Sequence, residues 1–495
     1  MIPLVTSPDW TVVAAVAGVV LVLADLAIRV VALGVIPANR RPASGMAWLL
    51  LTLLIPLAGF AIFLLFGRTA VGRARSRKQY VANAEIAART SGIDSGPVGT
   101  IPPYLQTVVR LNRELGALPL LADNNVEVLD DYRGSIAAMT AAVAEAEDYV
   151  HVEFYIVAWD VVTGPLMDAL SAAAERGVTV RLLFDHLGSR GIPGYDGLLS
   201  RLAGTGVEWH PMLPIQPLKG RFRRPDLRNH RKLLVVDGRV GFTGSQNLTE
   251  PGYNKPKNHR VGREWVELML RLEGPVVAAL DATFATDWYS ETDQVLSVQG
   301  CPAPAPAAGA LGGVACQLVP SGPGFTTENN LRMFTSLVYG ATRRISLTSP
   351  YFVPDESLLY AVTTAAQRGV PTELFVSEAS DQFMVGHAQA SYYRALLEAG
   401  VRIHLYPAPF VLHSKHFTID DDVAVVGSSN MDMRSFALNY ELSTMLLGSD
   451  IVSRLRAVED TYRVLSRELT LQEWGARPWR SRYVDNVMRL TAALQ

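Results

Sequence analysis

Two stretches of this sequence decide its fold: His230-Arg-Lys-Leu-Leu-Val-Val-Asp237 and His413-Ser-Lys-His-Phe-Thr-Ile-Asp420. Each has a Lys two residues after the His (Lys232, Lys415) and the Asp five residues after that Lys. Each is followed by a Gly-Ser-x-Asn segment, which supplies Ser245 and Asn247 in the first stretch and Ser428 and Asn430 in the second. All five positions repeat at an offset of 183 residues, although the chain contains only 6 Lys. The coincidence indicates an internal duplication.

The spacing within each stretch predicts its geometry. In an extended strand, residues two apart lie on the same face, so each His and Lys project together while the apolar run continues into a core. Asp237-Gly238 predicts a tight hairpin turn, and the returning strand brings Ser245 and Asn247 back toward the His end. Two such sets around a twofold axis put two His and two Lys around one cleft. Two Lys suit a phosphate, and two His suit nucleophilic and acid–base roles near neutral pH.

Working outward, each copy also contains a strand–helix–strand pattern. Residues 149–184 and 344–376 both read as a buried strand, an amphipathic helix and a second strand, which calls for a parallel sheet. The two helices end almost identically, in Ala-Ala-Glu-Arg-Gly-Val at 173–178 and Ala-Ala-Gln-Arg-Gly-Val at 365–370. We therefore predict an α/β fold made of two copies of one domain related by pseudo-twofold symmetry.

The most hydrophobic part of the chain is its N-terminal region. A first apolar run extends from Thr11 to Ile36, and a second, of 21 uncharged residues, from Met46 to Phe66. Each is long enough to cross a bilayer of roughly 30 Å as a helix. A signal peptide fits poorly because no basic residue precedes the first run, and an uncharged 21-mer argues against a buried core hairpin. We predict a transmembrane hairpin in which Asp25 and Arg29 either pair with each other or face the protein.

The predicted organisation has six parts: a transmembrane hairpin (1–67), a basic juxtamembrane linker (68–120), the first half (121–300), a low-complexity linker (301–313), the second half (314–470) and a helical tail (471–495). Five basic residues follow the second apolar run, against Arg40 and Arg41 before it. The positive-inside rule then predicts a multi-pass membrane protein whose remaining 400-odd residues lie on the cytoplasmic face.

Composition excludes several classes. The net charge of -2 argues against nucleic-acid binding by bulk charge, and 49% apolar residues exclude disorder. Two cysteines, Cys301 and Cys316, are too few for a disulfide framework. No phosphate-binding glycine loop or cluster of metal ligands is present, so we expect no cofactor and no metal.

With these motifs the chain resembles the phospholipase D superfamily and, within it, the bacterial cardiolipin synthases. The resemblance runs nearly end to end and includes Ser349-Pro-Tyr-Phe-Val-Pro-Asp355, Gly427-Ser-Ser-Asn-Met-Asp-Met-Arg-Ser435 and Asn439-Tyr-Glu441. It implies that one motif His becomes a phosphohistidine while the other handles protons. We assign the nucleophile to His230 and the acid to His413, with the reverse assignment left open by the near-symmetry of the halves.

The resemblance also implies roles for the remaining site residues. Lys232, Lys415, Asn247 and Asn430 would hold the phosphoryl oxygens, with Ser245 and Ser428 beside them. A downstream carboxylate orients a His: Glu441 takes that role in the second half, and Glu267, at a spacing of 22 rather than 13 from its Ser, is the weaker counterpart in the first. The motif residues Asp237 and Asp420 lie at turns, where they brace the loop.

The implied reaction joins two phosphatidylglycerol molecules into cardiolipin and glycerol. The expected partners are these lipids and the bilayer, with a homodimer left open and no nucleic acid. A hydrolase of the same superfamily, transfer to another lipid such as phosphatidylethanolamine, and a non-enzymatic scaffold are the alternatives. Complete motifs in both halves argue against the scaffold.

Two further segments carry charge. The first half has an insertion before His230 with five basic residues (Lys219, Arg221, Arg223, Arg224 and Arg228), which either meets anionic headgroups or is a solvated loop. The tail from Trp474 to Leu494 mixes aromatic and Arg residues, which fits an interfacial helix and packing against the body equally well.

Overall fold

The computed structural model describes residues 10–38, 42–67, 72–92, 101–215, 224–298, 311–325 and 327–491. The chain divides into two compact units, Met1–Thr69 and Ala70–Gln495. Arg40, Arg41, Cys301 and most of the 301–313 linker lie outside the described residues, as do Lys219, Arg221 and Arg223 of the basic insertion.

The N-terminal unit contains one helix long and apolar enough to cross a membrane, α1 (Trp10–Val35). Within it Arg29 Nε donates to Asp25 Oδ2 at 2.7 Å, which confirms the predicted pair. Asp25 and Arg29 thereby neutralise each other's charge inside an apolar helix.

The second predicted span needs correction, because the structure divides it in two. Helices α2 (Pro42–Leu54) and α3 (Pro56–Phe66) are separated at Ile55, whose φ of -134° and ψ of 76° are not helical. Pro56 has no amide hydrogen, and its ring disfavours the helical conformation of the residue before it. At about 1.5 Å per residue neither helix alone crosses a hydrocarbon core. In the described part of this unit, the second apolar run is therefore two short helices in place of one continuous span.

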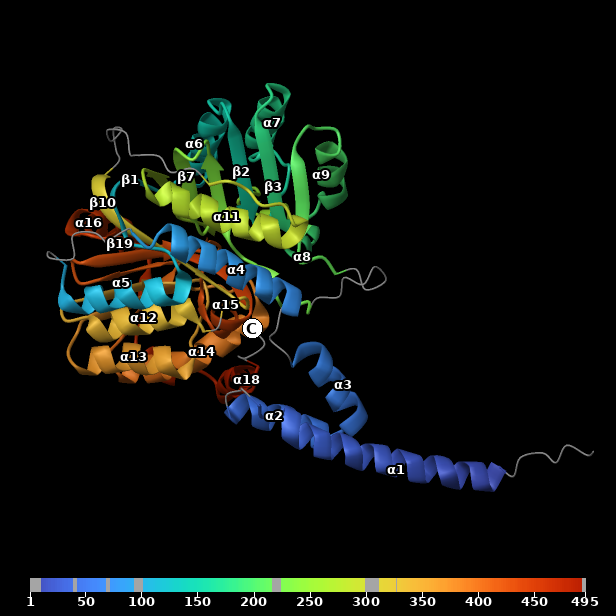
Figure 1. The fold of residues 1–495 in the computed structure, drawn as a ribbon. Helices are drawn as coiled ribbons and strands as arrows, with labels where there is room; N and C mark the ends of the chain where they lie inside the picture. The colour runs from blue at the N-terminus through green and yellow to red at the C-terminus, as the bar shows by residue number, and fades with distance from the viewer. Residues whose placement is uncertain are drawn as a thin grey trace, which may run out of the picture. The chain divides into compact units, whose positions relative to one another are not determined.

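The second unit is built on one continuous sheet (Figure 1). Its central strands, β1 (Leu121–Leu129) and β10 (Leu311–Ser321), pair antiparallel and begin the two halves. Outward from β1 the order is β9 (Met269–Glu273), β7 (Val240–Gly244), β6 (Lys232–Val236), β2 (Tyr149–Phe154), β3 (Thr179–Asp185) and β4 (Glu208–Met212). Outward from β10 it is β19 (Asn439–Leu447), β17 (Val423–Gly427), β16 (His416–Ile419), β11 (Ile345–Thr348), β13 (Thr372–Ser377), β14 (Arg402–Tyr406) and β20 (Arg467–Leu469). Apart from β20, the two orders match strand for strand, as duplication about a pseudo-twofold axis requires.

Both predicted strand–helix–strand units are confirmed. Strands β2 and β3 pair parallel across α7 (Gly164–Glu175), and β11 and β13 pair parallel across α13 (Glu356–Gln367). Gly177 and Gly369, which follow the two helices, have φ of 90° and 86°. These left-handed conformations end both helices at equivalent positions.

Helices cover both faces of the sheet (Figure 1). One core lies under α11 (Val276–Thr292) and α16 (Ser449–Leu465), and it joins residues of both halves. On the opposite face the first half has α6 (Tyr132–Ala144), α7 and α9 (Tyr195–Leu202), and the second has α12 (Asn329–Gly340), α13 and α14 (Phe383–Glu398). The short helices are α8 (His186–Arg190), α10 (Pro256–His259), α15 (Met433–Ala437) and α17 (Leu471–Gly475), and α18 (Trp479–Arg489) ends the described chain.

The segment expected to be a linker, 68–120, has two helices among its described residues, and both pack on other helices of the second unit. Helix α4 (Arg73–Arg89) lies against α11, and α5 (Pro103–Gly116) lies against α12. Basic charge alone suggested a solvated linker, but Arg75 is buried and pairs with Glu291. In α5 the buried Leu105, Val108 and Val109 form one apolar face.

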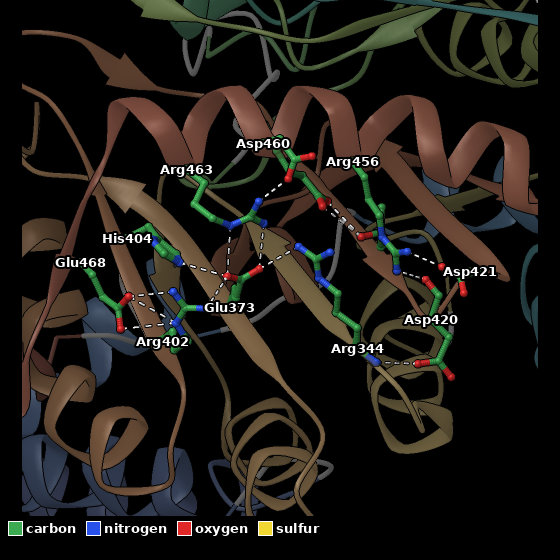
Figure 2. Close-up of polar contacts among 12 residues, drawn as sticks. Arg344, Glu373, Arg402, His404, Asp420, Asp421, Arg456, Asp460, Arg463 and Glu468 are labelled. Carbon is green, nitrogen blue, oxygen red and sulfur yellow. Dashed lines mark hydrogen bonds and ion pairs between the residues drawn. The ribbon is translucent and has the colours of Figure 1, made fainter.

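An ion-pair network ties the outer strands of the second half to α16 (Figure 2). Its centre is Glu373 on β13, which accepts from Arg344 at 3.0 Å, Arg402 at 3.2 Å and Arg463 at 2.8 Å. Burial by itself would raise the pKa of Glu373, but hydrogen bonds from His404 and Arg463 hold it well below its usual range. The network lies on strands at the edge of the sheet and serves the fold.

Candidate active site

The hairpins that carry the two motifs turn at Asp237 and Asp420, both with φ of 51°. Asp237 accepts from three successive backbone amides, Glu147 to Tyr149, at 2.8–2.9 Å. Asp420 likewise accepts from the amides of Thr342 and Arg343 and from that of Arg344, a contact drawn in Figure 2. Each Asp is five residues along a strand from its Lys, roughly 17 Å away. Both carboxylates brace the entry to β2 or β11 and lie apart from the histidines.

Each motif histidine is held by a carboxylate of the other half. His230 Nδ1 lies 3.0 Å from both carboxylate oxygens of Glu441, and His413 Nδ1 lies 2.6 Å from Glu267 Oε1. The sequence interpretation assigned each Glu to its own half. The structure instead crosses the pairs, so that neither half alone completes a His–Glu pair.

Short strands explain the crossing. Before His230, β5 (Arg228–Asn229) pairs parallel with β19, and the His230 amide donates to Tyr440 O at 2.8 Å. Before His413, β15 (Val411–Leu412) pairs parallel with β8 (Trp265–Val266), and the His413 amide donates to Val266 O at 2.8 Å. Each histidine is therefore hydrogen-bonded through its backbone to the residue directly before the Glu of the other half.

The Gly-Ser pairs hold the carboxylates in place. Ser245 Oγ donates to Glu267 Oε2 at 2.6 Å, and Ser428 Oγ donates to Glu441 Oε2 at 2.5 Å. A Cβ on Gly427 would lie 2.3 Å from Leu442 O, and one on Gly244 would lie 2.3 Å from Leu268 O. Glycine is required because the strands approach closely there. Both serines therefore stand behind the histidines as supports for Glu267 and Glu441.

The lysines are buried beside the histidines. Lys232 Nζ donates to His230 O and Lys415 Nζ donates to His413 O, each at 2.6 Å. Each ammonium group keeps two further hydrogens for a phosphate. Burial lowers the pKa of both histidines, and the charges of the two lysines lower it further.

The two asparagines differ. Asn247 is tied to the protein, since its oxygen accepts from the Ile156 amide at 3.3 Å and one N–H donates to Tyr253 OH at 2.8 Å. The Asn430 side-chain oxygen is buried and has no hydrogen-bond partner among the described residues. In either asparagine only the NH2 group can donate to a phosphoryl oxygen, because the amide oxygen can only accept.

Sequence reasoning assigned no role to two tyrosines, Tyr155 directly after β2 and Tyr351 three residues after β11. The Tyr155 ring lies 5.0 Å from the His230 ring, and Lys232 Nζ lies 5.4 Å above it. The Tyr351 ring lies 6.4 Å from that of His413. Both follow the first strand of a parallel unit, at the edge where such sheets build their sites. Their position after these strands is the signal from which sequence reasoning could have identified them as site residues.

One residue of the basic insertion has a structural place. Arg228, only 3% exposed, donates to Asp185 Oδ1 at 3.2 Å, and the Asn229 amide donates to Asp185 Oδ2 at 3.0 Å. Arg224 pairs with Asp226, its Nε lying 2.7 Å from Oδ1. Asp185 thus anchors the segment that leads into His230, and Arg228 is not part of a solvated loop.

The two halves differ electrostatically. Burial, with the charges of Lys232 and Lys415, holds the pKa of His230 well below its usual range. Burial also lowers the pKa of His413, but Glu267 opposes that effect. Burial raises the pKa of Glu441 to about 7, whereas contact with His413 outweighs burial and lowers the pKa of Glu267. The charge of Glu267 keeps the pKa of His413 from falling as far as that of His230, so His413 is the more readily protonated of the two and His230 rests neutral.

Burial also lowers the lysine pKa values, to about 7 for Lys232 and about 8 for Lys415. Glu267 and Glu441 offset only part of the cost of burying the two ammonium groups. An anion placed between them would restore both charges. This arrangement can bind a phosphodiester, attack its phosphorus with a neutral imidazole and protonate the leaving oxygen.

Comparison with known families agrees with this chemistry. A family profile described as "Cardiolipin synthase, PLD-like domain" matches residues 139–288 and 335–460, and one described as "Phospholipase_D-nuclease N-terminal" matches residues 21–68. The first profile covers both halves of the sheet and each motif histidine.

Curated relatives extend the match over most of the chain. Cardiolipin synthase A of Proteus mirabilis is 31% identical over 91% of this chain and 92% of its own length. The cardiolipin synthase of Geobacillus kaustophilus is 32% identical over 96% of this chain and 94% of its own. Among solved structures, the phosphatidylserine synthase of Haemophilus influenzae matches 78% of this chain and 99% of its own, with a TM-score of 0.60 and 12% identity. That last likeness concerns the fold.

Proposed function

The chain belongs to the cardiolipin synthase family of phospholipase D-like proteins, and from that premise we propose that it joins two phosphatidylglycerol molecules into cardiolipin and releases glycerol. The observation that carries the proposal is the pair of crossed His–Glu contacts, each beside a buried lysine. The curated relatives that match this chain over more than 90% of their length are cardiolipin synthases. They therefore favour this reaction over hydrolysis and over transfer to another lipid.

In the first step, His230 is the nucleophile. Its Nδ1 is occupied by Glu441, so Nε2 attacks the phosphorus of the first lipid and forms a P–N bond. The P–O bond to the glycerol headgroup breaks, and His413 gives its proton to the departing oxygen. The neutral state of His230 and the charged Glu267 behind His413 support this division of roles over the reverse.

In the second step, neutral His413 takes a proton from the primary hydroxyl of the second lipid's headgroup. That oxygen attacks the phosphohistidine, the P–N bond breaks, and His230 returns to its starting state. One diester is broken and one is made, so the exchange is nearly balanced in free energy and needs no activated donor. The same histidine acts as acid and then base, as microscopic reversibility allows.

The lysines and Asn430 hold the phosphoryl oxygens. Charge grows on these oxygens in the transition state, and donors already in position stabilise it without reorganisation. A compact ammonium suits each buried position, so Lys232→Arg should lose activity despite keeping its charge, because a planar fork does not fit there.

The enzyme is associated with the membrane through its N-terminal apolar unit, and we propose a specific topology for it. Helix α1 crosses the bilayer, α2 and α3 together return the chain, and the catalytic unit lies in the cytoplasm. The excess of basic residues after Phe66 supports this orientation. Cysteines placed at positions 43 and 90 test it in intact cells: an impermeant reagent should label position 43, and labelling of position 90 would invert the topology.

The reaction is tested with purified enzyme in detergent, phosphatidylglycerol and a chelator. Glycerol and cardiolipin should form in equal amounts, and an acid quench with labelled lipid should trap phosphate on His230. Strict dependence on a nucleotide-activated lipid, phosphatidic acid as the only product, or phosphate on His413 would each contradict part of the scheme.

A further inference from the structure

The C-terminal helix α18 packs on α14 with a defined direction (Figure 1). His387 Nδ1 lies 2.7 Å from Asp485 Oδ1, and the Arg489 guanidinium lies 4.6 Å from the centre of the Tyr392 ring. The residue numbers rise together in both contacts, so the two helices run parallel. Their N-terminal ends, which begin with Trp479 and Phe383, therefore lie at the same side.

That side borders the active site. Immediately before α14, Asp381 Oδ1 accepts from Tyr351 OH at 2.9 Å and Gln382 Nε2 donates to the same hydroxyl at 2.9 Å. The Tyr351 ring lies 6.4 Å from the ring of His413. The start of α14 is thus one residue layer from the reacting histidine.

The outer face of α18 carries large apolar side chains at helical spacing. Trp479 is 66% exposed, Tyr483 63% and Leu490 85%, and Val487 lies between the last two on the same face. The opposite face holds Asp485, which is buried against His387, and Met488, which packs on the core. The first turn of α14 adds Phe383, at 69% exposed, and Met384.

Arginines flank this stripe on both sides. Arg480 adjoins one edge and Arg482 the other, and both are exposed; Arg489, farther round on the side of Arg482, packs over Tyr392. The one acidic residue of the helix, Asp485, is neutralised by His387 and by Arg477, whose NH1 lies 2.8 Å away. An apolar stripe with aromatic residues, flanked by basic side chains, is the pattern of a helix that lies in a membrane interface.

We propose that the outer face of α18 and the first turn of α14 form a docking face for an anionic phospholipid bilayer beside the active site. Trp479 and Tyr483 enter the headgroup region, and the arginines meet lipid phosphates. The part of the site beside Tyr351 and His413 is then held close to the surface from which its lipids come. The proposal rests on the proposed function only for the identity of those lipids.

Scattered apolar residues elsewhere do not make such a face. Val161 and Val464 are each 85% exposed, but Val464 adjoins only Leu465 and lies on α16, away from α14. Isolated exposures of this kind are ordinary on soluble surfaces. Val464 therefore supplies a matched control at equal or greater exposure.

The test places an environment-sensitive fluorophore at position 483 of the full chain. Tyr483→Cys and the control Val464→Cys are made in a Cys301→Ser background, in which the remaining Cys316 is buried. Each is reconstituted in phosphatidylcholine vesicles with and without phosphatidylserine. The label at 483 should shift to the blue and be quenched by spin-labelled lipid, more strongly with phosphatidylserine, while the label at 464 stays in water.

A label at 483 that behaves like the one at 464 in both vesicle types would overturn the proposal. A shift that disappears as the protein is diluted in lipid would also overturn it, because the face would then contact a second copy. Trp479→Glu with Tyr483→Glu should lower cardiolipin formation in vesicles about fivefold relative to Val464→Glu. The fluorescence shift does not require turnover. A labelled chain that docks but makes no cardiolipin would therefore contradict the proposed function and not the docking face.

Discussion

The two active-site histidines are chemically similar residues that differ in the carboxylate each one meets. Glu267 opposes the effect of burial on His413, so its charge keeps the pKa of His413 from falling further. Glu267→Gln removes this negative charge, so the pKa of His413 falls and His413 loses its proton at a lower pH. We expect the alkaline limb of the kcat profile to move down and kcat at neutral pH to fall by about 100-fold. Glu264→Gln, an exposed neighbour, is the control, and an unmoved limb would contradict the assignment of His413 as acid.

The buried lysines make a second prediction, about protons. Their pKa values in the empty site are about 7 and about 8, so at pH 8 much of the ammonium charge is absent. A bound phosphodiester anion raises both values, and binding at pH 8 must therefore take up protons. Below pH 6 both lysines are already charged, and the uptake should vanish. An indicator dye in weakly buffered solution measures this proton uptake in a His230→Asn variant, which binds lipid without turnover. Adding Lys232→Met should reduce the uptake. Proton uptake that is independent of pH would contradict the lowered pKa values of the two lysines.

At the scale of the strand pairs, Gly427 sets how closely β17 approaches β19. A Cβ there would meet Leu442 O at 2.3 Å and push apart the strands that carry Ser428 and Glu441. Gly427→Ala should cost about 1–3 kcal/mol of stability, as overpacking does, and lower activity more than tenfold through the displaced Glu441. Gly197→Ala, at a helical position with open space, is the control. Thermal unfolding and kcat are measured on both variants. If the activity of Gly427→Ala fell only in proportion to its folded fraction, the loss would come from unfolding and not from a displaced Glu441.

Much at this scale could be read from the sequence. The period-two and helical patterns predicted both strand–helix–strand units, and the Asp-Gly pair predicted the first hairpin, because those structures depend on local residues. The break at Ile55 also had a local signal in Pro56, which the length of the apolar run outweighed. The crossed Glu267 and Glu441 had none, because a two-residue strand that pairs with the other half, such as β5, carries no periodicity of its own.

For the whole molecule, the duplication explains why the site exists at all. Each copy supplies one histidine, one lysine and one carboxylate, and the carboxylate serves the histidine of the other copy. The halves are joined across β1 and β10 in a single sheet, which keeps the two sets in register. The sequence predicted the repeated fold and a shared cleft, but the exchange of partners depends on the packing of one half on the other.

This architecture makes a last prediction about chains that are each missing one histidine. A His230→Ala chain and a His413→Ala chain, purified separately and reconstituted together, should show no more activity than the sum of the two alone. The reason is that both histidines of one site enter from the same continuous sheet, held by β5–β19 and β15–β8 pairing within one chain. The mixture is compared with wild type diluted by an equal amount of a doubly substituted chain, which measures any loss from co-reconstitution. Restored activity in the mixture would mean that two chains exchange halves in a dimer and build each site between them.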